Sequence, residues 1–221
     1  MNPEFWLARW ENGEIGFHLD HVNPHLPEHS SSFAGMTGQV LVPLCGKTID
    51  MQWLCQQGCS VLGVELSELA VKAFFEQASL TPEVTQHGPF QRWQAGCLEI
   101  LCGDFFQLTA ADVAACTVIY DRAALIALPP ELRTRYVHHL RAIFPQGVQM
   151  LLITLDYPQH EINGPPFSIS AQEVQDWYAA YSDIRQLASL DVLQQNERFL
   201  QRGVSSLTEQ VFHIGIRPCA S

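Results

Sequence analysis

The chain has 221 residues, of which 47% are hydrophobic and 16% are charged, a composition typical of a globular protein with a substantial core. Its formal net charge of −11, with only 12 lysines and arginines, argues against a nucleic acid or another polyanion as partner. The sequence contains no run of about 18 apolar residues, and it begins without a basic, apolar targeting pattern. We therefore expect a cytoplasmic protein that contacts neither nucleic acid nor membrane.

The chain contains seven cysteines, and several of them fall within predicted strands and helices. Their number is odd, and no two of them form a Cys-x-x-Cys pair. We therefore expect buried, reduced thiols rather than a disulfide framework, and no zinc site.

Residues 1–38 are not expected to join a sheet, because aromatic residues at helical spacing are followed by a stretch that contains several glycines and prolines. Phe5, Trp6 and Trp10 suit one face of a helix. A purely structural role is the alternative for the two tryptophans, which would then only hold this segment against the rest of the chain.

Four histidines further along this segment nearly follow a helix face and raise the alternative of a metal site: His18, His21, His25 and His29. Pro24 and Pro27 would interrupt a continuous helix there. We therefore predict that no metal is bound and that most of these histidines lie at the surface, with His18 a candidate to line a site.

From Gln39 onward, apolar runs alternate with amphipathic stretches, which is typical of βαβ units and a parallel sheet. The predicted strands are 39–43, 60–64, 98–102, 115–120, 148–155, 184–192 and 208–216. The last of these alternates as an antiparallel pair would, and residues 81–95 are predicted as a loop, with a hairpin as the alternative. Helices are predicted near 49–57, after Ser67, after Pro130 and after Ser170.

This order of elements predicts one α/β domain, residues 1–221, with a three-layer, doubly wound, Rossmann-like architecture. Its mostly parallel seven-stranded sheet has an antiparallel last strand. Residues 39–221 form the α/β core, and residues 1–38 form a separate N-terminal segment. Five strands that alternate with helices, followed by a terminal β pair, are the order of elements in the class I methyltransferase sheet.

The loop after the first strand belongs to the segment VLVPLCGKT, and Glu65 ends the second strand, 19 residues beyond Gly46 (46 to 65). An acid about 20 residues past such a loop binds ribose hydroxyls in open α/β sheets. A P-loop would need glycine at Leu41, and a dinucleotide fingerprint would need three glycines. We therefore predict a nucleoside ligand without phosphates, and S-adenosylmethionine is the common cofactor that fits. Cys45 lacks a neighbouring base and is interpreted as structural.

Four segments in this order have a familiar form: LVPLCGKTIDMQWL, GVELSELAVKAFF, YDRAALIALPP, and ITLDY followed by GPPF. From Trp10 to the C-terminus the chain resembles the thiopurine S-methyltransferase family in its bacterial form. The resemblance implies a monomeric, cytoplasmic enzyme that moves a methyl group from S-adenosylmethionine to a small aromatic or heterocyclic thiol, leaving S-adenosylhomocysteine. Bacterial members are also associated with selenium and tellurium compounds.

The resemblance also implies roles for residues at the cofactor. Leu44 would contact the cofactor, and Glu65 would bind its ribose hydroxyls. Trp10 and Phe17 belong to the N-terminal segment, which folds over cofactor and substrate as a helical lid in the family. The alternative for Glu65 is to cap the following helix.

Two arginines are implied at the reacting atoms. Arg122 would lie beside both the methionine moiety and the acceptor, and Arg198 would face the acceptor. The alternatives are that Arg122 pairs with Asp121 or Asp156, and that Arg198 lies in a solvated loop.

Asp104 occupies a place where mammalian members have a small hydroxyl residue. An acid after the third strand often accepts the adenine N6 amino group in methyltransferases at large, and Phe105 beside it would pack on the adenine ring. The alternative for Asp104 is a turn residue.

The chemistry we expect is an in-line displacement without a covalent intermediate, driven by alignment and by two cationic side chains rather than by a general base. Two rival functions remain open. One is methyl transfer to a metalloid oxyanion or to another oxygen or nitrogen acceptor, and the other is non-catalytic nucleoside binding.

Overall fold

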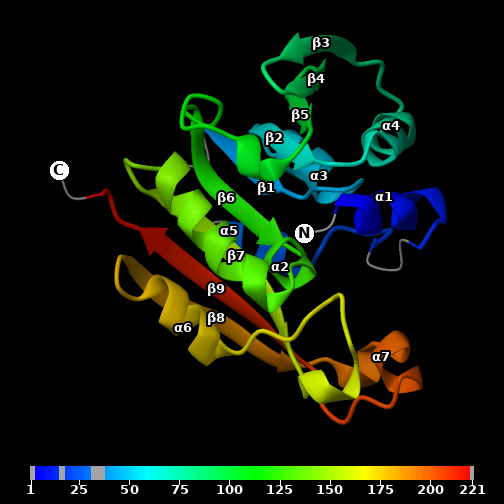
Figure 1. Cartoon of the computed structure of the whole chain (residues 1–221), viewed down its shortest axis with the longest axis vertical. Coiled ribbons are helices and arrows are strands. Elements are labelled where there is room, and N and C mark those ends of the chain that lie inside the picture. Colours follow the sequence, from blue (N-terminus) through cyan, green and yellow to red (C-terminus); the bar gives the residue numbers. More distant parts are fainter. Residues whose placement is uncertain (1–2, 15–17, 31–37, 220–221) are drawn as a thin grey trace. The chain divides into compact units, whose positions relative to one another are not determined.

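The computed structural model describes residues 3–14, 18–30 and 38–219, and it divides into two compact units, residues 1–120 and 121–221 (Figure 1). The described residues form nine strands in a mixed sheet with helices. The prediction of a mostly parallel α/β sheet is confirmed, whereas the predicted count of seven strands is wrong by two.

The two additional strands are β3 (Glu83–His87) and β4 (Phe90–Ala95), in the stretch where a loop was favoured over a hairpin. They form an antiparallel hairpin around Gly88, whose φ of +55° suits a tight turn. Every residue of β3 is exposed, so its sequence lacks the alternation of apolar and polar residues that announces a half-buried strand.

The first unit contains the parallel strands β1 (Gln39–Pro43), β2 (Ser60–Glu65), β5 (Leu98–Cys102) and β6 (Cys116–Arg122), the last of which continues into the second unit. Its strand order is β3-β4-β5-β2-β1-β6. Val40, Leu41 and Val42 are almost completely buried, as expected for a strand covered on both faces. Its α-helices are α1 (Pro3–Glu11), α2 (His25–His29), α3 (Asp50–Gln56) and α4 (Glu68–Gln77), and Figure 1 shows α1 beside α4.

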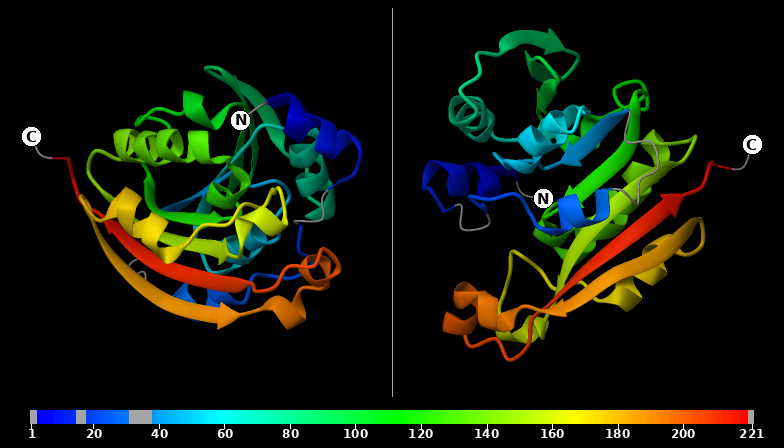
Figure 2. Two further views of the ribbon diagram at one scale, coloured as in Figure 1. Left: turned by 60° about the horizontal axis from the view of Figure 1, so that its bottom comes forward. Right: turned by 180° about the vertical axis from the view of Figure 1, so that it is seen from behind.

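The second unit contains the antiparallel strands β7 (Val148–Asp156), β9 (Thr208–Ile216) and β8 (Ser182–Asp191), in that order. Its α-helices are α5 (Pro130–Ile143), α6 (Ala171–Tyr178) and α7 (Glu197–Gln201), and α6 begins with the predicted capping box of Ser170 and Glu173. Figure 2 shows the long β8 and β9 side by side, with α6 against them. The prediction that the last strand is antiparallel is confirmed.

Among the described residues, four short 3₁₀ helices lie in loops that follow strands: η2 (Phe105–Gln107), η3 (Leu125–Ala127), η4 (Gln159–Glu161) and η5 (Leu193–Gln195). Within the described ranges, no helix is long and apolar enough to cross a membrane.

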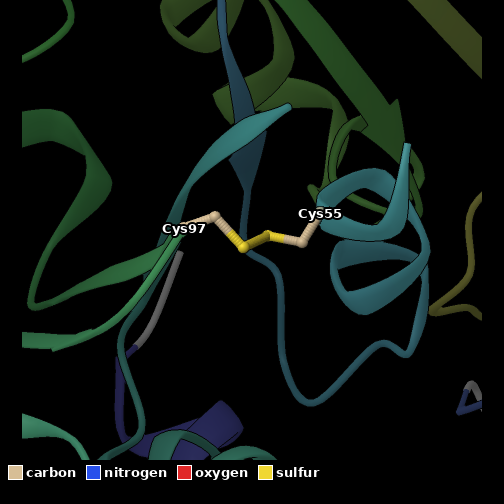
Figure 3. The surroundings of a disulfide bond; sticks show 2 residues. All are labelled: Cys55 and Cys97. Atoms are coloured by element: carbon tan, nitrogen blue, oxygen red, sulfur yellow. A yellow bond between two sulfur atoms is a disulfide. The ribbon is translucent and has the colours of Figure 1, made fainter. Parts of the chain in front are cut away.

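One pair of cysteines contradicts the expectation of reduced thiols. Cys55 near the end of α3 and Cys97 between β4 and β5 form a disulfide, with their Cα atoms 6.0 Å apart (Figure 3). The two residues are 42 positions apart in sequence, so only the packing of α3 beside this turn brings them together. Cys45, Cys59 and Cys116 are buried thiols, as expected.

The expected break among the histidines is confirmed at Pro24, because the described residues 18–24 are not helical, whereas Pro27 does not interrupt α2. Pro24 precedes the first residue of α2, and Pro27 lies in the first turn, where a helix does not need the missing N–H group. As a result, His25 is buried and His29 is half-buried rather than both lying at the surface.

Candidate active site

The loop after β1 is held by hydrogen bonds that leave little room for a phosphate. The backbone N–H of Cys45 donates to the carbonyl of Val64 (3.0 Å), and that of Thr48 donates to the carbonyl of Cys45 (3.2 Å). The N–H of Gly46 donates to Oε2 of Glu65 (2.8 Å). These three donors are therefore committed within the protein, which agrees with the predicted absence of a phosphate cradle.

Leu44 turns the chain at the start of this loop. Its φ is +48°, a left-handed conformation that costs a non-glycine residue roughly 1–3 kcal/mol. Its side chain is half-buried. Residues with a strained backbone of this kind cluster at active sites and ligand-binding loops.

Glu65 ends β2 with a carboxylate that is only 7% exposed. Oε2 accepts from Gly46 N, and Oε1 accepts from Ser67 N, both at 2.8 Å. Burial raises the pKa of this carboxyl group, and the bonds from Ser67 and Gly46 oppose that shift. Each oxygen has a second lone pair, so the carboxylate can also accept from a ligand's hydroxyl groups.

The capping alternative for Glu65 holds in part, because Oε1 of Glu65 accepts from the backbone N–H of Ser67, the N-cap residue of α4. Ser67 is the N-cap of α4, and its hydroxyl oxygen accepts from Ala70 N at 3.3 Å. Glu65 thus fixes the backbone on both sides of the strand end, through Gly46 and Ser67.

Asp104 and Phe105 follow β5 at the same edge of the sheet. Glu65 and Cys102 are register partners, and Gly103 N donates to the Glu65 carbonyl at 2.8 Å. Oδ1 of Asp104 accepts from Phe106 N at 3.0 Å, so this exposed acid does cap the turn that begins η2. Phe105 is 5% exposed, whereas Phe106 is half-buried and offers more surface to a ring.

Trp10 lies against the loop. A Cβ atom added to Gly46 would come within 3.2 Å of Cζ2 of Trp10, and Gly46 has a φ of +54°. The backbone conformation thus favours glycine here, and a Cβ atom would press on the indole ring of Trp10. The structure therefore brings Trp10, the loop and Glu65 together, while Phe17 lies outside the described residues.

Sequence reasoning missed a buried acid that anchors the N-terminal segment beside this loop. Asp50, at the start of α3, is 1% exposed, and its carboxylate accepts from Asn23 N and from the hydroxyl of Tyr120, both at 2.9 Å. The side-chain oxygen of Asn23 in turn accepts from His25 N at 3.0 Å. An acid in the first turn of a helix has an ordinary role as a cap, so no local pattern indicates this long-range bond.

Arg122 belongs to the second unit, at the end of β6, and it is half-buried. The next residue, Ala123, has a φ of +72°, so the chain turns sharply after the arginine. Within the described part of this unit, no ion pair joins Arg122 to Asp121 or Asp156. Asp156 instead accepts from Ser168 and Gln210, both at 3.3 Å.

Asp121 shapes the turn after Arg122. Its carboxylate is completely buried, accepts from Leu125 N at 3.1 Å, and accepts from the hydroxyl of Tyr136 at 2.7 Å. Burial raises the pKa of Asp121 to about 6, although the Tyr136 hydrogen bond lowers it. Asp121 thus ties the residues after the turn to α5.

Arg198 lies on α7 and is half-buried, so the alternative of a solvated loop is not what the structure shows. Phe199 next to it packs in a buried cluster with Tyr157 and Leu207. A separate cavity of about 390 Å³ in this unit is lined by Glu161, Ile162, Asn163, Gly164 and Arg202.

Solved structures identify the class of this fold. A methyltransferase from Anabaena variabilis, described as dependent on S-adenosylmethionine, superimposes with a TM-score of 0.67 at 13% identity, covering 98% of this chain and 96% of that one. The 1,6-didemethyltoxoflavin-N1-methyltransferase of Burkholderia thailandensis, solved with its substrate and S-adenosylhomocysteine, gives a TM-score of 0.63 at 14% identity, covering 97% and 87%. The chain has the class I methyltransferase fold.

Sequence comparison identifies the family within that class. The model of the thiopurine S-methyltransferase family matches residues 1–216. The thiopurine S-methyltransferase of Pseudomonas aeruginosa strain UCBPP-PA14 is 52% identical over 213 residues, covering 96% of this chain and 98% of the relative. The chain belongs to the thiopurine S-methyltransferase family, and it is an S-adenosylmethionine-dependent methyltransferase.

Proposed function

We propose that this enzyme transfers the methyl group of S-adenosylmethionine to the sulfur of an aromatic or heterocyclic thiol, such as the thiopurine 6-mercaptopurine. The observation that carries the proposal is Arg122, a half-buried guanidinium placed by a sharp turn that a buried acid anchors. A fixed cation of this kind suits a thiolate acceptor. Relatives named for thiopurines support the same acceptor class.

The residues around Glu65 fit a nucleoside cofactor. We assign the ribose hydroxyls to the remaining lone pairs of Glu65 and a contact with the cofactor to Leu44. The oxygen of Asp104 that does not cap the turn would accept the adenine amino group, with Phe105 presenting its exposed edge to the ring. Trp10 would cover the cofactor from above the loop.

When bound, S-adenosylmethionine supplies a methyl group already activated by the charge of its sulfonium. The chain must then align the acceptor, and alignment alone can lower a barrier by several kcal/mol. A heterocyclic thiol ionises readily near neutral pH, so no general base is required. Arg122 and Arg198 would favour and steer the thiolate, because a guanidinium stays charged at any working pH.

Aromatic residues of the N-terminal segment would exclude water from the reacting atoms. A cation–π contact of Trp10 with the sulfonium would be worth roughly 0.5–2 kcal/mol. Phe17 is assigned to the acceptor on the family resemblance alone, because it lies outside the described residues.

We further propose a cytoplasmic monomer that acts on small molecules and not on nucleic acid, consistent with its net charge of −11. Residues 1–38 would form the covering segment of a single domain whose core is 39–221. Sedimentation of the reduced protein with and without S-adenosylhomocysteine would test the monomer.

The test of function is transfer of a labelled methyl group from S-adenosylmethionine to 6-mercaptopurine, with selenite and tellurite as parallel acceptors. Transfer to the thiol is the expected result. Transfer to selenite or tellurite alone would mean that the acceptor is a metalloid oxyanion and not a thiol. If the protein binds S-adenosylhomocysteine tightly but methylates none of the three acceptors, the result would favour non-catalytic nucleoside binding over methyl transfer to these acceptors.

A further inference from the structure

Three side chains of α2 direct their donor atoms toward one another. Nδ1 of His25 lies 3.6 Å from Oε2 of Glu28, and Nε2 of His29 lies 3.8 Å from the same oxygen. All three donor atoms lie within 4.8 Å of one another. The two imidazole rings are nearly parallel, with their centroids 5.8 Å apart and 14° between their planes.

The spacing of these residues explains the cluster. Residues three and four positions apart share one face of a helix, so a helical turn from His25 places Glu28 and His29 beside it. The turn forms because Pro24 and Pro27 occupy positions in which proline is tolerated. The prolines that argued against a metal site in the sequence are therefore compatible with one in the fold.

Two imidazoles and a carboxylate are a donor set that suits divalent transition metals such as Zn²⁺ rather than Mg²⁺ or Ca²⁺. In a tetrahedral zinc site with Zn–N bonds of about 2.0–2.1 Å, donor atoms lie about 3.3 Å apart. The two separations from Glu28, 3.6 and 3.8 Å, are close to that value, and the two imidazole donors lie within 4.8 Å of each other, so side-chain rotations would bring all three donors onto one ion.

The environment of the cluster also favours a ligand. Nε2 of His29 is buried and has no hydrogen-bond partner among the described residues, an arrangement that a metal ion would relieve. Glu28 is 62% exposed and leaves the cluster open to solvent for entry of an ion and for a water ligand.

The backbone that carries the ligands is firmly held. His25 N donates to the side chain of Asn23, whose own N–H donates to the buried Asp50. Leu26 is 1% exposed in the core. Ligands on a fixed element lose little entropy on binding, which favours a metal site.

We propose that His25, Glu28 and His29 bind one divalent transition-metal ion of the Zn²⁺ type, with solvent completing its coordination. The ion would brace α2 in the N-terminal segment. It has no part in the methyl-transfer chemistry, so the proposal does not depend on the identity of the acceptor.

The test uses the full chain, prepared without a histidine tag and stripped with a chelator. Zn²⁺ binding is measured by calorimetry, Co²⁺ is used as a visible-absorbing substitute, and Mg²⁺ is the control ion. We expect one Zn²⁺ per chain, a rise in Tm with Zn²⁺, and no binding of Mg²⁺. Because even the outer partners of metal ligands change affinity 10–100-fold, loss of a ligand should weaken binding by about 100-fold or more.

The variants are His29→Gln and Glu28→Gln, the second at an exposed position where misfolding is not expected. The control is His87→Gln, which removes a surface imidazole paired with Asp112 at 2.8 Å. Weaker binding in both cluster variants but not in the control would support the proposal. No stoichiometric binding, unchanged affinity in Glu28→Gln, or a cysteine-type charge-transfer band with Co²⁺ would overturn it.

Discussion

Glu65 and Asp121 are both acids near the end of a parallel strand, and burial raises the pKa of each, yet they serve different ends. Glu65 is 7% exposed, and among the described residues its two oxygens accept from the backbone N–H groups of Gly46 and Ser67, each of which uses one lone pair. Asp121 is 0% exposed and accepts from a buried tyrosine hydroxyl as well as from the backbone.

The difference teaches how to separate a binding acid from a scaffolding acid. Burial and a perturbed pKa are common to both, so neither property distinguishes them. What distinguishes them is the partner of the second oxygen: the backbone N–H of Gly46 in the loop for Glu65, and the hydroxyl of Tyr136 inside the core for Asp121. The predictions that follow test this distinction, in order of decreasing effect.

The largest effect is expected for cofactor affinity. Glu65→Gln replaces an acceptor oxygen by a donor, so it should weaken S-adenosylhomocysteine binding by about 100-fold, corresponding to about 3 kcal/mol for charge-assisted hydrogen bonds. Asp121→Asn should change this affinity by less than about threefold, because its carboxylate faces the core. Calorimetry on both variants measures the contrast, and equal losses would contradict it.

The next effect concerns turnover. Arg122→Ala should lower kcat for a thiol acceptor by about 30-fold, close to the loss of one charge-assisted hydrogen bond, with a smaller change in S-adenosylhomocysteine affinity. Arg122→Lys keeps the charge and should recover part of the rate. A loss of cofactor affinity equal to the loss of rate would instead place Arg122 with the cofactor alone.

The third effect is the pH dependence of stability. Because Asp121 has a pKa of about 6 in the fold and 3.8 as its ordinary value, the native state binds a proton more tightly than the unfolded chain between these values. The free energy of unfolding should therefore fall as the pH rises from about 4 to about 6.

Two variants isolate this contribution. Asp121→Asn should flatten the fall, whereas Tyr136→Phe should extend it to higher pH, because the tyrosine hydrogen bond lowers the pKa of Asp121. Urea titrations across this range measure the slope. A slope in Asp121→Asn equal to that of the unmodified protein would assign the dependence to another group, such as Glu65.

The smallest effect compares two glycines with nearly equal φ. Gly46 and Gly88 have φ of +54° and +55°, so alanine at either position should cost about 1 kcal/mol of stability. Only Gly46 has Trp10 within reach of the added Cβ atom, whereas Gly88 has no atom within 4 Å among the described residues. Gly46→Ala should therefore also weaken cofactor binding, and Gly88→Ala should not. Equal behaviour of the two variants in calorimetry would remove Trp10 from the site.

Elements with buried side chains could be predicted from the sequence, because burial of one face imposes a regular spacing of apolar residues. β1 and β7 were predicted for this reason, and β3 was missed as a strand because all of it is exposed. The prediction that Glu65 binds ribose hydroxyls followed from its spacing to Gly46. The roles of Arg122 and Arg198 came only from the family resemblance and remain proposals.

Contacts between residues far apart in the sequence could not be predicted for a different reason. Asp50 meets Asn23 and Tyr120, and Cys55 meets Cys97, only because separate elements pack together. Nothing in the local sequence of either residue depends on its distant partner. The same holds for Asp121, which the sequence suggested only as a partner for Arg122.

The Cys55–Cys97 bond encloses β2, α4 and the β3–β4 hairpin in a covalent ring. A protease that cuts once at the exposed tip of the hairpin, near Gly88, would open that ring without releasing a fragment. The oxidised protein would then migrate as one species in a denaturing gel, and it would separate into two only after a reductant is added. A nicked sample could therefore pass for intact protein on a denaturing gel unless its disulfide is reduced first.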